Sequence, residues 1–211
     1  MILPFILLCI SSLYCFSVSY GEFCDAITQN QGPHPTMEQY SSFVRSAEKF
    51  AISDKRELAM VLSQLLWESD RLRTKEEYGC DNNKCLNTYF DGIGDPSKAY
   101  HGRGYIQLTW GSNYLKASES LYGNRRLLEN PDLVCNVDQI AWDVSFWFWK
   151  TVVQVQPGVT DGCFGASTKA INGNLECNGY NEKAVKRFLM YKIVFDTFNI
   201  TGNPNESGCY N

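Results

Sequence analysis

The stretch DKRELAMVLSQLLWES, residues 54–69, carries the clearest helical pattern in the chain. Asp54 is a helix-capping residue type, and Glu57 three positions later completes a capping-box pattern. Glu68 continues a stripe of apolar residues that recur at spacings of four and three along one face. The segment therefore predicts a helix with a buried face that ends at a carboxylate.

The position of Glu68 suits an acid–base role. A carboxylate at the end of an apolar stripe is expected to be partly desolvated, and desolvation favours the protonated form that a general acid needs. The alternative is that Glu68 only ends the helix and reaches water. The pattern alone leaves both interpretations open.

A second pair of carboxylates, Glu76 and Glu77, follows closely. On a continuous helix, Glu68 and Glu77 would lie on opposite faces, about 13 Å apart along the axis. We therefore expect the helix to stop soon after Glu68, so that the chain folds back across a cleft. Cys80 and Cys85, with turn-forming residues between them, permit a disulfide loop that fixes this return. Only one of the two adjacent glutamates is expected to face the cleft.

The length and composition predict one globular domain. The chain has 211 residues, of which 44% are hydrophobic, and its net charge is −4, so a packed core is expected. It has no Lys or Arg run, and nucleic acid is therefore not an expected partner. No repeat or long linker divides it.

The first 19 residues, MILPFILLCISSLYCFSVS, are mostly apolar and become small and polar near Ser17 and Ser19. This composition predicts a signal peptide over residues 1–19, a single domain over residues 20–211, and a secreted protein without a membrane partner after cleavage. The alternative is an uncleaved anchor, for which the stretch is short. The glycosylation acceptors Asn199 and Asn205 indicate a surface-exposed C-terminal tail.

Removal of this segment leaves seven cysteines, an odd number. In an oxidising compartment, three disulfides and one spare thiol are expected, although connectivity does not follow from sequence alone. Cys24 could be free, could pair with Cys135 or Cys163, or could form an intermolecular bond.

Helical periodicity predicts a mainly α fold with a small β-hairpin between residues 70 and 110. The predicted helices span residues 37–50, 54–69, 136–151 and 181–197.

Four further stretches occur in a fixed order along the chain: YHGRGYIQLTWGSNY (100–114), NPDLV (130–134), WFWKT (147–151) and INGNLEC (171–177). Together they resemble the motifs of glycoside hydrolase family 19 chitinases, and the match spans most of residues 60–191. The resemblance implies a lysozyme-like, mainly helical fold of two lobes around a substrate cleft, with the small hairpin beside it.

The resemblance also implies residue roles. Glu68 corresponds to the general acid, and Glu77 to the base, because compact family members place the second glutamate nine positions after the first. An inverting glycosidase separates two such carboxyl groups to admit a water. Glu176 and Arg187 would join a charged network on the base side of the cleft. The residues implied to bind substrate or support it are Gln107, Thr109, Asn113, Asn172, Glu176 and Arg187, and the implied disulfides are Cys80–Cys85 and Cys177–Cys209.

The chain departs from the family pattern at two places. A histidine that often precedes the general acid is Trp67 here, and an aromatic residue that often precedes Asn113 is Ser112. Trp67 is expected to pack beside the acid, and Ser112 removes a possible sugar-stacking platform. No lectin-type module precedes the domain, which indicates a compact member with few cleft loops.

Aromatic residues are interpreted as a mixture of cleft and core. Tyr89, Tyr100 and Trp110 are candidates for sugar stacking, and His101 for the cleft lining. The two histidines of the chain form no metal-binding pattern, so neither a metal nor a cofactor is expected. The aromatic cluster assigned to core packing comprises Trp142, Phe146, Trp147, Phe148 and Trp149.

These features predict a secreted, monomeric, endo-acting chitinase that hydrolyses β-1,4 bonds of N-acetylglucosamine polymers. One alternative is a hydrolase of the same fold acting on peptidoglycan or chitosan, since fold and glutamates do not determine the sugar. Another is a chitin-binding protein without catalysis. Retention of both Glu68 and Glu77 argues against it.

Overall fold

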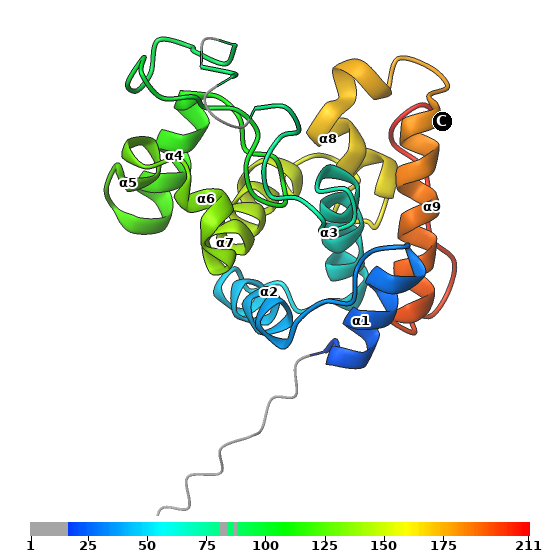
Figure 1. Ribbon diagram of the computed structural model, residues 1–211. Coiled ribbons are helices and arrows are strands. Elements are labelled where there is room, and N and C mark those ends of the chain that lie inside the picture. Colours follow the sequence, from blue (N-terminus) through cyan, green and yellow to red (C-terminus); the bar gives the residue numbers. More distant parts are fainter. Residues whose placement is uncertain (1–16, 81–83, 87) are drawn as a thin grey trace, which may run out of the picture.

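The computed structural model describes residues 17–80, 84–86 and 88–211, which are mainly helical (Figure 1). Among these residues, β-structure is limited to isolated bridges. In place of the expected hairpin, Arg103 forms one bridge with Glu76 and one with Leu108. The helices are α1 (Tyr20–Gln29), α2 (Met37–Lys49), α3 (Lys55–Glu68), α4 (Gly111–Tyr122), α5 (Arg126–Glu129), α6 (Leu133–Asn136), α7 (Asp138–Phe148), the π-helical η2 (Trp149–Val153), α8 (Phe164–Glu176) and α9 (Glu182–Thr197).

The helices form two groups, which correspond to the predicted lobes (Figure 1). In one group α7 packs against α2, α4 and α6, and α4 packs against α5. In the other group α3 and α8 pack against α9 and against each other, and α1 also contacts α9. The long non-helical segment between α3 and α4 passes between the groups in Figure 1.

All four predicted helical segments are confirmed, as α2, α3, α9 and the continuous pair α7 and η2. Helices α1, α4, α5, α6 and α8 were not predicted, and α4 and α8 lack a clear sequence signal. Part of α1's capping box, Ser19, lay in the segment assigned to the signal peptide. Helix α4 begins after Trp110 without a side-chain cap, and α8 is interrupted at Asn172, where φ is −142°.

Helix α3 is buried from Leu58 through Leu66 and ends at Glu68, as predicted. Asp54 caps it by accepting a hydrogen bond from the Glu57 N–H. The side chain of Glu57 does not close the expected capping box. It accepts hydrogen bonds from the Trp149 Nε1 and Gln154 Nε2 groups of the neighbouring segment instead.

The chain reverses immediately after α3 through three consecutive residues with positive φ: Asp70, Arg71 and Leu72. Each left-handed non-glycine residue costs about 1–2 kcal/mol, so the turn needs external support. Ser69 provides part of it, because its hydroxyl donates to the Leu65 carbonyl and accepts from the Leu72 N–H. This turn carries the following segment back across the end of α3.

The cysteine predictions are partly confirmed. The disulfides Cys80–Cys85 and Cys177–Cys209 are present. The predicted third disulfide is contradicted, because the thiols of Cys24, Cys135 and Cys163 are all free. The turn-forming residues 81–83 inside the first disulfide loop lie outside the described residues.

Residues 1–16 of the predicted signal peptide also lie outside the described part of the chain. Residues 17–19, however, belong to the packed domain. Val18 is fully buried, and its carbonyl accepts a hydrogen bond from Tyr40. Ser19 caps α1 in a reciprocal capping box with Glu22. Within the described residues no helix is long and apolar enough to cross a membrane.

Candidate active site

A cavity of about 590 Å³ opens at the end of α3. Its walls come from α3, from the non-helical segment that precedes α4, from the first turn of α4 and from α8. Six of the eight predicted site residues line it, so segments distant in sequence converge there: Glu68, Glu77, Gln107, Thr109, Asn113 and Asn172.

Glu68 meets a cation at the cavity wall. The Nη1 atom of Arg187 lies 2.5 Å from Glu68 Oε1, and the Glu68 side chain is 19% exposed. The same Nη1 donates to Gln64 Oε1 at 2.9 Å, and the ring of Trp67 lies 5.4 Å from the guanidinium carbon. Trp67 therefore packs against Arg187, the cation that contacts Glu68.

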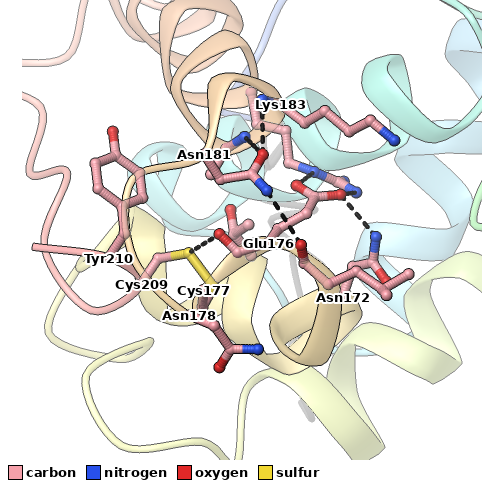
Figure 2. The surroundings of a disulfide bond; sticks show 12 residues. Asn172, Glu176, Cys177, Asn178, Asn181, Lys183, Cys209 and Tyr210 are labelled. Atoms are coloured by element: carbon pink, nitrogen blue, oxygen red, sulfur yellow. Dashed lines mark hydrogen bonds and ion pairs between the residues drawn. A yellow bond between two sulfur atoms is a disulfide. The ribbon is translucent and has the colours of Figure 1, made fainter.

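Glu176 completes the network from α8. Arg187 donates to both oxygens of Glu176 through Nε and Nη2, at 2.8 and 2.9 Å. Asn172 donates to Glu176 Oε1 from one turn earlier in the helix, beside the Cys177–Cys209 disulfide (Figure 2). Burial opposes the charge of Glu176, but the bonds from Arg187 and Asn172 outweigh it and lower the pKa of Glu176.

This arrangement corrects two expectations. The charged network was placed on the base side of the cleft, but its ion pair joins Glu68, the expected acid. Glu176 and Arg187 are 2% and 1% exposed and do not line the cavity, so they support Glu68 from behind. Sequence reasoning also missed Gln64, although it lies one helical turn before Glu68 on α3.

Glu77 is held on the non-helical wall of the cavity. Its backbone N–H donates to the Gly102 carbonyl, and the Gly102 N–H donates back to Glu77 Oε2 at 3.0 Å. The Tyr89 hydroxyl donates to Glu77 Oε1 at 2.6 Å. This bond, together with burial, raises the pKa of Tyr89 to about 12.

Glu76 is placed differently from its neighbour. It does not line the cavity, and its carboxylate lies 2.9 Å from His101 Nε2. His101 was expected to line the cleft but is 2% exposed and also absent from the cavity wall. Burial and the nearby Arg103 lower the pKa of His101. Of the two adjacent glutamates, the structure therefore turns Glu77 towards the cavity.

The segment before α4 and its first turn present three polar side chains. Gln107 Nε2 donates to the Gly104 carbonyl, the Thr109 hydroxyl to the Gln107 carbonyl, and Asn113 Nδ2 to the Thr109 carbonyl. These bonds orient the side chains from within the segment. A Cβ at Gly102 would lie 2.6 Å from Gln107 Oε1, so a larger residue there would displace the Gln107 amide.

Two of the three candidate stacking aromatics line the cavity. Tyr89 and Trp110 meet edge-to-face with ring centroids 5.4 Å apart. Tyr100 is 1% exposed and belongs to the core, whereas Phe148, assigned to core packing, lines the cavity. Trp142, Phe146, Trp147 and Trp149 are buried, as expected. Among the described residues, no cluster of His, Cys, Asp or Glu could hold a metal ion.

Comparisons with known proteins identify the family. A family profile described as "Chitinase class I" matches residues 72–165. "Chitinase 10" of Oryza sativa subsp. japonica is 31% identical over 206 residues, covering 79% of this chain and 70% of the rice protein. Two endochitinases of Arabidopsis thaliana are 37% and 38% identical over 79% and 73% of this chain. The chain spans only 58% and 53% of their lengths.

Solved structures agree with these matches. Chitinase C from Streptomyces griseus HUT6037 superposes with a TM-score of 0.76 at 28% identity, covering 93% of this chain and all of that one. A family 19, class IV chitinase from Zea mays superposes with a TM-score of 0.73 at 26% identity, covering 92% and 98% of the two chains. The fold is that of a family 19 glycoside hydrolase. The chain belongs to the glycoside hydrolase family 19 chitinases.

Proposed function

We propose that this protein is a secreted endo-acting chitinase that cleaves β-1,4-linked N-acetylglucosamine polymers with inversion. The observation that carries the proposal is the placement of Glu68 and Glu77 on different walls of one cavity. Inversion needs two carboxyl groups with room between them for a water. The relatives named chitinase and endochitinase support the substrate.

Glu68 is the proposed general acid. Arg187 contacts two carboxyl groups, those of Glu68 and Glu176. Glu176 is buried, does not line the cavity and accepts bonds from Arg187 and Asn172. Glu68 lines the cavity, so it is the carboxyl group of the two that can reach the leaving oxygen of a bound sugar.

Glu77 is the proposed general base. Its two oxygens accept hydrogen bonds from the Tyr89 hydroxyl and from the Gly102 N–H, and these contacts fix the orientation of the carboxylate. A carboxylate held in this way can accept a proton from water as that water attacks the sugar carbon. Thr109 lines the same cavity, and its hydroxyl oxygen is the proposed second contact of the water.

Substrate binding is assigned to the polar cavity wall. The amide groups of Gln107, Asn113 and Asn172 line it and suit hydrogen bonds to the hydroxyl and acetamido groups of the sugar. Arg187 and Glu176 act on the substrate only through Glu68 and Asn172. We propose that the protein works as a monomer on chitin or its oligosaccharides.

Secretion is proposed from the apolar N-terminal segment. The folded domain includes Val18 and Ser19, so we place the signal-peptide cleavage site before Ser17 and not after residue 19. Mass spectrometry of the N-terminal peptide of the secreted protein tests this. A mature chain beginning at Tyr20 would lack the α1 cap and contradict the assignment.

The test of the activity is digestion of the N-acetylglucosamine hexamer, followed by proton NMR of the product anomers. We expect initial release of the α-anomer by the wild type, and at least a hundredfold lower rates, roughly, for Glu68→Gln and Glu77→Gln. Glu76→Gln is the matched control, because this neighbour does not line the cavity, and it is expected to retain most activity.

The outcome also separates the alternatives. Initial β-anomer release would contradict inversion, and binding without cleavage would favour a non-catalytic chitin-binding protein. Activity on peptidoglycan or chitosan but not on the hexamer would identify one of those polymers as the substrate. The rate should fall on the alkaline side as the acid loses its proton, and a rate unchanged up to about pH 9 would contradict the role of Glu68.

A further inference from the structure

Tyr89 has two features that a sugar-stacking residue does not need. Its hydroxyl donates to Glu77 Oε1 at 2.6 Å, which is short for a neutral donor and typical of a bond to a carboxylate. Its ring meets Trp110 edge-to-face with an interplanar angle of 84°. A hydrogen bond thus holds the hydroxyl of Tyr89, and an aromatic contact holds its ring.

The backbone that carries Tyr89 is itself fastened to α4. The carboxylate of Asp91 accepts from the Ile93 N–H at 3.2 Å and from the Ser112 N–H at 3.0 Å. Although burial opposes the charge of Asp91, the bonds with Ser112 outweigh it and lower the pKa of Asp91. Helix α4 has no side-chain cap of its own at Trp110, so Asp91 supplies an acceptor to the first turn of this helix from outside.

Gly111 makes this contact possible. A Cβ at Gly111 would lie 2.2 Å from the Ile93 carbonyl oxygen and 3.1 Å from Asp91 Oδ1. The loop over residues 89–93 therefore rests directly on the backbone at the start of α4. This contact joins the loop that carries Tyr89 to the start of α4.

We propose that Tyr89 is a positioning residue whose hydroxyl orients Glu77 in the cavity, and that the contact of Asp91 with the start of α4 holds Tyr89 in place. This inference rests on the proposed role of Glu77 as the base. Without Tyr89, the Gly102 N–H remains the one described hydrogen-bond donor to the Glu77 side chain. The carboxylate could then rotate away from the attacking water.

The test separates positioning from stacking by removing only the hydroxyl. In Tyr89→Phe the ring remains available to a sugar, so a stacking role predicts unchanged kcat and KM. A positioning role predicts a kcat on the hexamer that falls roughly tenfold to a hundredfold, with KM changed by less than about twofold.

The matched control is Tyr78→Phe. Tyr78 is the residue next to Glu77, and its hydroxyl also donates to a carboxylate, Asp70 Oδ2, at 3.0 Å. It is 72% exposed and does not line the cavity, so its substitution should leave kcat and KM unchanged. Asp91→Asn, which retains one acceptor oxygen, should lower kcat in the same direction as Tyr89→Phe but by less.

A readout without turnover distinguishes this inference from the proposed activity. In protein labelled with [ζ-¹³C]tyrosine, Glu77→Gln should shift the Tyr89 resonance and leave that of Tyr78 in place. An inactive wild type would overturn the proposed function and the inference with it. Two results would overturn the positioning role alone. One is an active wild type with an unchanged kcat in Tyr89→Phe, and the other is a Tyr89 resonance whose chemical shift does not change in Glu77→Gln.

Discussion

The two walls of the cavity hold their carboxylates by different means. Glu68 ends a buried helix and is contacted by Arg187, which is 1% exposed and comes from a second helix. Glu77 lies in irregular chain, beyond a left-handed turn, and is fastened by Tyr89 and the Gly102 N–H. The helical wall is stabilised by packing and a buried ion-pair network, whereas the irregular wall depends on individual hydrogen bonds and one short disulfide loop.

This difference predicts where substitutions act. Removal of one partner from a buried ion-pair network leaves an unpaired charge in the core and lowers the stability of the whole domain. Glu77 and Tyr89 on the irregular wall are only partly buried, so a change at either should alter the position of one carboxylate with a smaller effect on unfolding. Stability and activity are thus expected to respond separately in the two walls.

The largest effect on stability is expected for Arg187→Met. This change leaves the buried Glu176 without its cation and should lower the free energy of unfolding by about 3–5 kcal/mol. Lys186→Met is the matched control, because Lys186 pairs with Glu182 on the same helix but is 55% exposed. It should change stability by less than about 0.5 kcal/mol. Urea denaturation measures both, and a loss below about 1 kcal/mol for Arg187→Met would contradict the role of the network.

The two disulfides sharpen the contrast. Cys177 and Cys209 are 32 residues apart, and Cys80 and Cys85 are 5 apart. Loop-closure entropy predicts losses of about 4 and about 2 kcal/mol for the respective double serine variants. The Cys80/Cys85 double serine variant should lose less stability but more kcat than the Cys177/Cys209 variant, because the Cys80 N–H donates to the Glu77 carbonyl. Thermal unfolding and hexamer hydrolysis measure the two responses.

Cys135→Ser is the control for this pair of variants, since Cys135 belongs to no disulfide. Its substitution should leave both unfolding and hydrolysis close to the wild type. If the double serine variant at Cys177 and Cys209 lost more activity than the variant at Cys80 and Cys85, the division of roles between the two walls would be wrong.

The same division explains what the sequence could predict. Helix α3, its end at Glu68 and the reversal after it follow from periodicity and the spacing of the acids. The contact between Glu68 and Arg187 does not, because it joins residues far apart in sequence through tertiary packing. Helix α8 was missed because its interruption at Asn172 breaks the helical pattern.

On the irregular wall, Gln107 and Thr109 were predicted only through the resemblance to a family. No periodicity marks Gln107 or Trp110, which adopt positive φ values of 55° and 77° that local preference disfavours. The choice between Glu76 and Glu77 depended on the pairing of Glu77 with Gly102, a contact between distant segments. In a non-helical segment, tertiary hydrogen bonds set the direction of each side chain. The sequence alone therefore did not decide which of the two glutamates faces the cavity.

The smallest expected effect is a pH dependence confined to the irregular wall. Burial lowers the pKa of His101 from 6.5, so the unfolded chain binds the proton more tightly than the folded one. Stability from the neutral imidazole is therefore present above about pH 6.5 and decreases as the pH falls below it. Glu176 has a lowered pKa, so its contribution is lost only in more acidic solution, as the pH falls below 4.5.

Urea denaturation between pH 7 and pH 5 tests this assignment. His101→Gln retains a hydrogen-bonding side chain towards Glu76 but cannot titrate, so it should flatten the slope of stability against pH over this window. The other histidine of the chain, His34, provides the matched variant His34→Gln, which should keep the wild-type slope. An unchanged slope of stability against pH in His101→Gln would mean that other groups cause the acid sensitivity. The irregular wall would then have no pH response of its own.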